Sequence, residues 1–357
     1  MKSHSPFRMD PTRVMDEISS FQRKLAAGIG QLRGAGVPDY ANTPRELFYS
    51  EDKLRVWHFK GEKKPTSKTP LLIVYALVNT VWMTDLQADR SLIRNLLEQG
   101  EDVYLIDWGY PDAADRWLTL DDYINGYIDR CVDAVRQKHR LDAIDVLGIC
   151  QGGVFSLCYT ALHPAKVRNL ITMVTPVNFH TPDNMLSHWA RTLDVDLFVD
   201  TMGNIPAALM NYVYLSLKPV RLNQQKYVGL VDILDRPVEL ENFLRMERWI
   251  FDSPDQAGEA FREFIKKFYQ DNGFVSGALE IGGRKIDLGK IAHPVLNIFA
   301  EQDHLVPPDA SRAMASHIGT EDYTQLAFNG GHIGIYVSGR AQREVPPAIH
   351  EWLRARA

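Results

Sequence analysis

The chain has 357 residues, of which 45% are hydrophobic and 24% charged, and its formal net charge at pH 7 is −5. This composition predicts a compact globular protein, either one large domain with an insertion or two domains. A weakly acidic chain without a Lys/Arg block has no electrostatic footprint for nucleic acid, so no polyanionic partner is expected.

The sequence carries no recognisable targeting, membrane or metal signal. The N-terminal stretch MKSHSPFRMDPTRVMDEISS lacks the apolar core of a signal peptide, and runs such as LLIVYALV at 71–78 are too short to span a bilayer. Cys131, Cys150 and Cys158 form no CxxC pair and no cluster with metal-ligand spacing. We therefore expect a cytosolic protein with free thiols and no metal site.

Short apolar runs that end in turn residues recur along the chain, as expected of buried parallel strands. They occupy 70–78, 102–107, 144–149, 170–174, 294–300 and 323–328. Helical periodicity fills most of the gaps between them, at 89–98, 121–139, 151–163 and 309–317. Alternating strands and helices predict an α/β fold with a mostly parallel sheet covered by helices on both faces.

This alternation stops in the middle of the chain. Residues 176–290 contain several helical patterns and no convincing strand, so we interpret them as a helical cap inserted into a catalytic core of 46–175 and 291–357. Residues 1–45, with a weak helical pattern and the Gly/Pro-rich passage GAGVPDYANTP, are predicted to form an N-terminal arm.

The stretch LGICQGG at 147–153 has the outline of the hydrolase turn Gly-x-Ser-x-Gly, with Cys150 in the place of the serine. It follows a predicted strand and precedes a predicted helix, and Gly148 and Gly152 permit the sharp turn that exposes a nucleophile. The motif alone is weak, and a buried cysteine beside a glycine turn is the alternative. The strand and helix around Cys150 favour the nucleophile.

Acyl transfer at such a turn also needs donors for an oxyanion. We expect the backbone N–H of Gln151 to be one donor, because it opens the helix directly after the nucleophile. The second is expected from the loop after the strand at 70–78, where Val78 and Asn79 offer backbone N–H groups.

A cysteine nucleophile of this fold needs an acid and a histidine that follow it in that order. Asp303 comes just after the strand at 294–300, and His332 follows the strand at 323–328 behind a glycine pair. His304 adjoins Asp303 and is the competing histidine, but only His332 stands where the catalytic histidine of an α/β hydrolase belongs. Cys131 and Cys158 are interpreted as core residues.

With these sites placed, the chain closely resembles the catalytic subunits (PhaC) of class III polyhydroxyalkanoate synthases from about Tyr49 onward. The resemblance rests on nine runs: LLIVYALVN, VYLIDWGYPD, LTLDDYINGYIDRCVD, VLGICQGG, TMVTPVNFHTPDN, DTMGNIP, RMERWIFDSPDQAGE, FAEQDHLVPPDAS and GGHIGIYVSG. They are far more specific than the turn motif. Residues 1–45 match less clearly, and nothing is carried over to them.

The resemblance implies an α/β-hydrolase fold and an acyltransferase that polymerises (R)-3-hydroxyacyl-CoA, with 3-hydroxybutyryl-CoA as the expected monomer. It makes Cys150 the acylated nucleophile, His332 the general base and Asp303 the third member of the triad. No cofactor is implied, because CoA is part of the substrate and leaves as a product. The implied partners are a PhaE-type second subunit and a second copy of the chain, at the surface of cytoplasmic polyester granules.

Two other classes remain open at this point. A Cys-triad hydrolase, such as a thioesterase or an intracellular polyester depolymerase, would use water where the synthase uses a hydroxyl group. A granule scaffold on an inactive hydrolase fold is the non-enzymatic alternative, and the intact set of Cys150, Asp303 and His332 argues against it.

Overall fold

The computed structural model of the chain describes Asp16, Ser19, Asp39 and residues 42–218 and 226–357. The chain divides into two compact units, residues 40–217 with 251–357 and residues 1–39 with 218–250. Most of the predicted N-terminal arm lies outside the described residues. No helix in the described part of the chain is long and apolar enough to cross a membrane.

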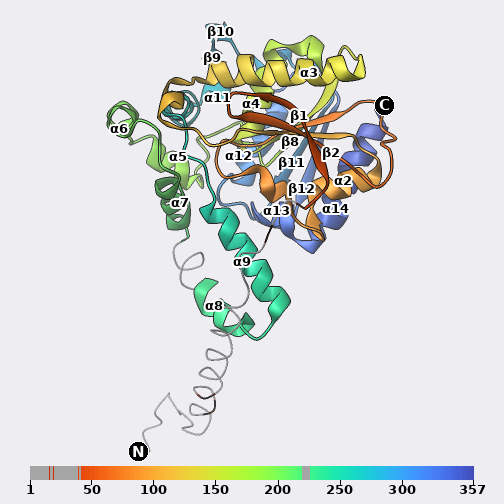
Figure 1. Ribbon diagram of the computed structural model, residues 1–357. Helices are drawn as coiled ribbons and strands as arrows, with labels where there is room; N and C mark the ends of the chain where they lie inside the picture. The colour runs from red at the N-terminus through yellow and green to blue at the C-terminus, as the bar shows by residue number, and fades with distance from the viewer. Residues whose placement is uncertain (1–15, 17–18, 20–38, 40–41, 219–225) are drawn as a thin grey trace, which may run out of the picture. The chain divides into compact units, whose positions relative to one another are not determined.

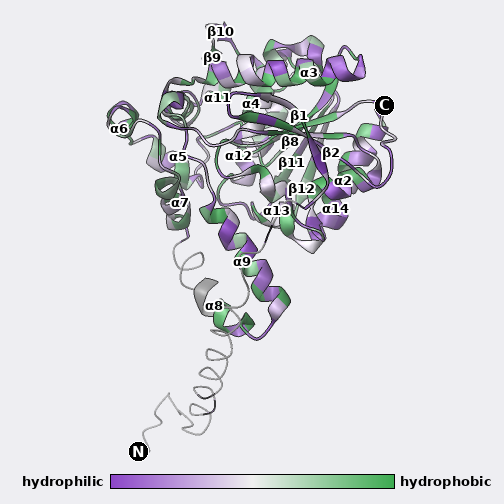
Figure 2. Cartoon of the chain, in the orientation of Figure 1, coloured by the Kyte–Doolittle hydropathy of each residue, from purple (hydrophilic) through white to green (hydrophobic). Residues whose placement is uncertain are grey.

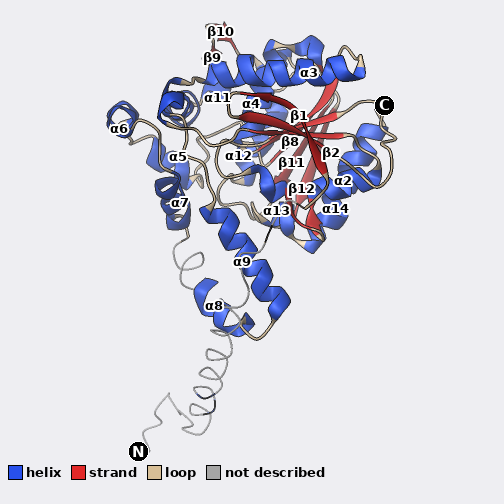
Figure 3. Ribbon diagram, viewed as in Figure 1, coloured by secondary structure: helices blue, strands red, loops and turns tan. Residues whose placement is uncertain are grey.

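The larger unit is built on a sheet of eight strands in the order β1-β2-β6-β3-β7-β8-β11-β12, which Figure 3 shows with helices on both sides. Six neighbouring strands are parallel. They are β3 (Leu71–Val74), β6 (Val103–Asp107), β7 (Ile144–Ile149), β8 (Val167–Met173), β11 (Val295–Ala300) and β12 (Tyr323–Phe328). These six coincide with the predicted strands, and the predicted α/β fold is confirmed.

One edge of the sheet was not predicted. β1 (Arg45–Glu51) and β2 (Leu54–Phe59) form an antiparallel hairpin, and β2 also pairs antiparallel with β6. The hairpin turns at Asp52, whose φ is 50°. Its strands mix charged with apolar residues and are only partly buried, so they lack the continuous apolar run that reveals the inner strands.

Helices cover both faces of this sheet (Figure 1). α3 (Asp129–His139) and α4 (Gln151–Leu162) pack on one face, and α3 continues a π-helical stretch at Asp122–Ile128. On the other face, α2 (Leu92–Gln99) packs along α14 (Gly339–Arg354). Much of α2, α3 and α14 carries hydrophilic residues, drawn purple in Figure 2, which is expected of helices with one solvated side.

Shorter elements complete the core. The predicted helix at 309–317 is split into α12 (Pro308–Arg312) and a 3₁₀ turn at Ala313–Ser316, and α13 (Gly334–Val337) precedes α14. A small ribbon consists of β4 (Asp85–Gln87) and β5 (Arg90–Ser91).

The stretch 176–290 is largely helical, as the sequence indicated. Its helices are α5 (Met185–Ala190), α6 (Val195–Met202), α7 (Ala207–Ser216), α8 (Lys226–Ile233), α9 (Pro237–Phe251), α10 (Gly258–Phe264) and α11 (Gly273–Ser276), with a π-helical stretch at Ile265–Gln270. It also contains an unpredicted two-stranded ribbon of β9 (Glu280–Ile281) and β10 (Arg284–Lys285). α8 and all but the last residue of α9 belong to the smaller unit.

Candidate active site

Cys150 lies at a sharp turn between β7 and α4. Its φ and ψ angles are 55° and −120°, a strained conformation that residues with a side chain rarely adopt. The N–H of Cys150 donates a hydrogen bond to the carbonyl of Met173, at the end of β8, over 2.8 Å. The neighbouring strand therefore holds the strained residue in place, and the thiol is partly exposed.

The glycines of this turn are required by close backbone packing. A Cβ atom at Gly152 would lie 2.1 Å from the carbonyl oxygen of Val74 and 2.6 Å from that of Tyr75. A Cβ atom at Gly148 would lie 2.5 Å from the Cα atom of Gly153. Because a side chain would clash at either position, glycine at 152 lets the first turn of α4 approach the end of β3, and glycine at 148 lets it approach β7.

Asp303 and His332 meet at the carboxyl ends of β11 and β12. Oδ2 of Asp303 lies 2.7 Å from Nδ1 of His332, and both side chains are buried. The other carboxylate oxygen, Oδ1, accepts hydrogen bonds from the N–H groups of Leu305 and Val306, over 2.8 and 3.0 Å. The carboxylate is thus fixed in orientation, and one of its oxygens faces the imidazole.

The pKa of His332 depends on both Asp303 and Cys150. Burial by itself lowers the pKa of His332, but the negative charge and hydrogen bond of Asp303, together with the hydrogen bond to Cys150, raise it to about 10. The structure therefore brings Cys150, Asp303 and His332 together. The two other cysteines, Cys131 and Cys158, are wholly buried, and burial raises the pKa of both thiols.

The loop after β3 lies against this turn. The N–H of Leu77 donates to Oε1 of Gln151 over 3.0 Å, so that N–H is already used. Val78 and Asn79 come next, are partly exposed, and Asn79 has a φ of 63°. The spacing of the sequence gave no indication of the Gln151 side-chain contact, which ties the loop to the start of α4.

A small hollow adjoins this loop. It is lined mainly by Asn79, Thr80, Trp82, Trp108, Tyr110 and Pro254. Two indole rings and a phenol line part of it, together with the carboxyl group of Asp107.

Four tyrosines that were not predicted as site residues interact electrostatically with Cys150. They are Tyr75, Tyr214, Tyr269 and Tyr336. Burial raises the pKa of each phenol, and negative charge at Cys150 raises it further. The phenols therefore stay neutral near the thiol. Tyr214 and Tyr269 come from the helical stretch at 176–290, so that stretch contributes directly to the surroundings of Cys150.

Comparisons with known proteins can be set beside this geometry. Residues 69–338 match the family described as alpha/beta hydrolase fold. The chain is 61% identical over 353 residues to the poly(3-hydroxyalkanoate) polymerase subunit PhaC of Allochromatium vinosum, with 98% of this chain and 99% of that protein covered. It is 48% identical over 351 residues to the protein of the same name from Synechocystis sp., with 96% and 93% covered.

Among solved structures, the monoacylglycerol lipase of Paleococcus ferrophilus is similar in fold. Its TM-score is 0.51 and its sequence identity 16%, with 86% of this chain and all of the lipase covered. At that identity, the likeness bears on the fold alone.

Proposed function

Because the chain belongs to the family of poly(3-hydroxyalkanoate) polymerase PhaC subunits, within the α/β-hydrolase superfamily, we propose that it polymerises (R)-3-hydroxyacyl-CoA into polyester. The expected monomer is 3-hydroxybutyryl-CoA, and CoA is released at each addition. The single observation that carries the proposed mechanism is a cysteine, not a serine, at the strained turn facing the His332–Asp303 pair.

Sulfur suits this reaction for an energetic reason. The Cys150 thiol attacks the thioester carbon of the substrate, CoA leaves as a thiol, and a new thioester forms at nearly equal free energy. The acyl group therefore stays activated. When the 3-hydroxyl group of another acyl unit attacks that thioester, the product is an oxoester and the cysteine thiol is regenerated, so this step runs downhill towards polymer.

His332 serves as the general base in both steps. It takes the proton of the Cys150 thiol and passes it to the departing CoA sulfur, and later takes the proton of the attacking hydroxyl group and returns it to the sulfur of Cys150. Asp303 holds the imidazole in register and stabilises its charged form, which agrees with the raised pKa of His332. The backbone N–H groups of Gln151 and of Val78 or Asn79 are the proposed donors to the oxyanion that forms at the thioester carbonyl.

Water competes with the hydroxyl group at every thioester. We propose that residues 176–290 act as a cap that limits the access of water, since Tyr214 and Tyr269 of this stretch lie near the thiol. The reaction needs neither a metal nor a cofactor. The proposed partners are a PhaE-type second subunit and a second copy of the chain, and the proposed location is the surface of polyester granules in the cytoplasm.

The test is a product analysis with purified chain and 3-hydroxybutyryl-CoA. Release of CoA together with insoluble polyester is the expected result, and acid treatment should leave the acyl group on Cys150. Release of CoA with soluble 3-hydroxybutyrate instead would mean that water is the acceptor, and the chain would then be a thioesterase. Adding the PhaE-type partner should raise the initial rate before any granule exists.

A further inference from the structure

Ser253 connects the helical stretch at 176–290 to the loop beside Cys150. Its hydroxyl group donates a hydrogen bond to Oδ1 of Asn79 over 2.9 Å. Nδ2 of Asn211, a buried residue of α7, lies 3.5 Å from the same hydroxyl oxygen and is placed to donate to it. All three residues belong to the larger unit of the chain.

Asn79 has an unusual backbone conformation in this loop. Its φ of 63° lies in the left-handed region, which asparagine tolerates better than most residues but which still costs free energy. The loop is fixed two residues earlier, where the N–H of Leu77 donates to Gln151. The peptide between Val78 and Asn79 therefore lies between two anchors, one on the catalytic turn and one on Ser253.

The segment that carries Ser253 is itself held on both sides. Oδ1 of Asp252 accepts a hydrogen bond from the hydroxyl group of Tyr110 over 2.6 Å, and Oδ1 of Asp255 accepts one from the N–H of Ala207 over 2.8 Å. The backbones of Gln256 and Ile205 exchange hydrogen bonds of 2.9 and 3.0 Å. A hydroxyl group on so restrained a segment can fix the side chain that it contacts.

From this geometry we infer that Ser253 is a positioning residue, which holds Asn79 in its left-handed conformation and so aims the N–H groups of the 78–79 loop at the thioester oxygen. The inference rests on the proposed acyl transfer at Cys150, and it adds that the oxyanion donors are assembled through the helical stretch. A movement of the Ser253 segment away from Asn79 would then weaken catalysis without moving the nucleophile.

The test compares two reactions of the same thiol in Ser253→Ala. Acylation by 3-hydroxybutyryl-CoA passes through an oxyanion, whereas alkylation by iodoacetamide does not. We expect CoA release to slow by about 10- to 100-fold, which is no more than the effect of removing a whole oxyanion donor. The alkylation rate should stay within about twofold of wild type. Ser253→Thr keeps the hydroxyl group and should restore most of the acylation rate.

Ser216→Ala is the matched control, because within the described residues the Ser216 hydroxyl donates to the carbonyl of Tyr212 inside α7, and both rates should stay at the wild-type level. Unchanged acylation in Ser253→Ala would overturn the inference, and so would a parallel loss of both rates, which indicates a general structural role. The proposed function fails separately. If the wild-type chain yields free acid, the polymerase function is excluded. Acylation of Cys150 still passes through the same oxyanion in that case, so the Ser253 comparison still tests the positioning role of Ser253.

Discussion

The catalytic edge of the sheet and the contact between α6 and α10 are both polar arrangements, but different forces hold them. At the catalytic edge, Asp303 and His332 are buried, and the turn at Cys150 is enclosed by backbone atoms too close for a side chain at Gly152. Such an arrangement is fixed by packing, because moving one part creates clashes or buried unpaired charge.

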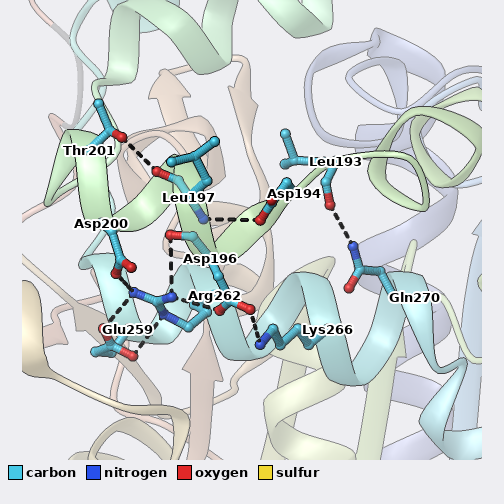
Figure 4. Close-up of polar contacts among 10 residues, drawn as sticks. All are labelled: Leu193, Asp194, Asp196, Leu197, Asp200, Thr201, Glu259, Arg262, Lys266 and Gln270. Atoms are coloured by element: carbon cyan, nitrogen blue, oxygen red, sulfur yellow. Dashed lines mark hydrogen bonds and ion pairs between the residues drawn. The ribbon is translucent and has the colours of Figure 1, made fainter.

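α6 and α10 pack through Val195, Val199 and Phe261 of a buried apolar cluster. Ion pairs around Arg262, which Figure 4 shows, add a polar contact between the same two helices. The guanidinium group of Arg262 lies 2.7 Å from Asp196, 2.6 Å from Asp200 and 3.1 Å from Glu259. The side chains of Asp196 and Asp200 are 51% and 68% exposed, so water and salt screen these pairs. Cys150, the proposed nucleophile, is therefore held by close packing, whereas the ion pairs between α6 and α10 are weak, screened contacts beside a buried apolar cluster.

The largest effect is expected at the fixed region, from Cys150→Ser. The alkoxide is harder to form than the thiolate, and the resulting ester transfers poorly, so polymer synthesis should fall by roughly three orders of magnitude or more. Melting should stay close to wild type, since the substitution is nearly isosteric. Polymer yield measures the loss of synthesis, and thermal unfolding measures the stability of the variant.

Cys131→Ala and Cys158→Ala provide the matched comparison for this change. Both thiols are buried away from solvent, so modest losses of stability with retained polymerisation are expected. A polymer yield in Cys150→Ser near that of wild type would remove this residue from the mechanism.

The second prediction distinguishes the two candidate bases, His332 and His304. His332→Gln should slow acylation by roughly two to four orders of magnitude, the usual contribution of a positioned general base. His304→Gln should be far milder, because the imidazole hydrogen-bonded to Asp303 is that of His332. Rapid-quench measurement of acyl-enzyme formation tests both, and a reversed order of the two effects would contradict this assignment.

The third prediction concerns pH and the buried pair. The pKa of His332 is raised from its ordinary value of 6.5 to about 10, so the charged imidazole stabilises the fold fully below about pH 6.5. That contribution to stability falls as the pH rises above 6.5 and is lost once the pH exceeds about 10. Asp303→Asn removes the main favourable charge, so the difference in free energy of unfolding between wild type and variant should shrink across this window. Asp309→Asn, at an exposed pair with Arg312, should show no such trend.

A fourth prediction tests the close packing at the turn. Gly152→Ala places a methyl group against the carbonyl oxygens of Val74 and Tyr75, which should cost about 1–3 kcal/mol of stability or prevent correct folding. Gly229→Ala, in α8, meets no atom within 4 Å and should be neutral or slightly stabilising. Equal denaturation midpoints for the two variants would show that the turn can relax.

Close packing around the site also explains which of its features could be predicted from the sequence. The inner strands could be predicted because a strand that is buried on both faces has a continuous run of apolar residues. Cys150 and its glycines could be predicted because this strained turn requires glycine at fixed positions around the nucleophile. The placement of Asp303 and His332 followed from strand ends, and the geometry agrees with it.

What could not be predicted depends on contacts between distant residues. The hydrogen bond of Leu77 to Gln151 joins positions 74 residues apart, and that of Ser253 to Asn79 joins positions 174 apart. No periodicity encodes the direction in which such side chains point. The β1–β2 hairpin was missed for a different reason, because its half-exposed strands carry charges that hide the apolar alternation.

The smallest effect is expected at the contact between α6 and α10, where Arg262→Met keeps the apolar stem and removes the charge. Exposed ion pairs contribute about 0.2–1 kcal/mol each, so the variant should lose on the order of 1 kcal/mol of stability at low salt. At about 1 M salt the Debye length falls to about 3 Å, and the difference from wild type should nearly vanish. Denaturant unfolding at the two salt concentrations measures this.

Arg236→Met is the control, because Arg236 makes an exposed pair with Glu239, three residues further along the chain, and should contribute almost nothing at either salt concentration. A loss of several kcal/mol that persists at high salt would contradict the comparison, because it would place Arg262 among the rigidly packed residues rather than the replaceable ones.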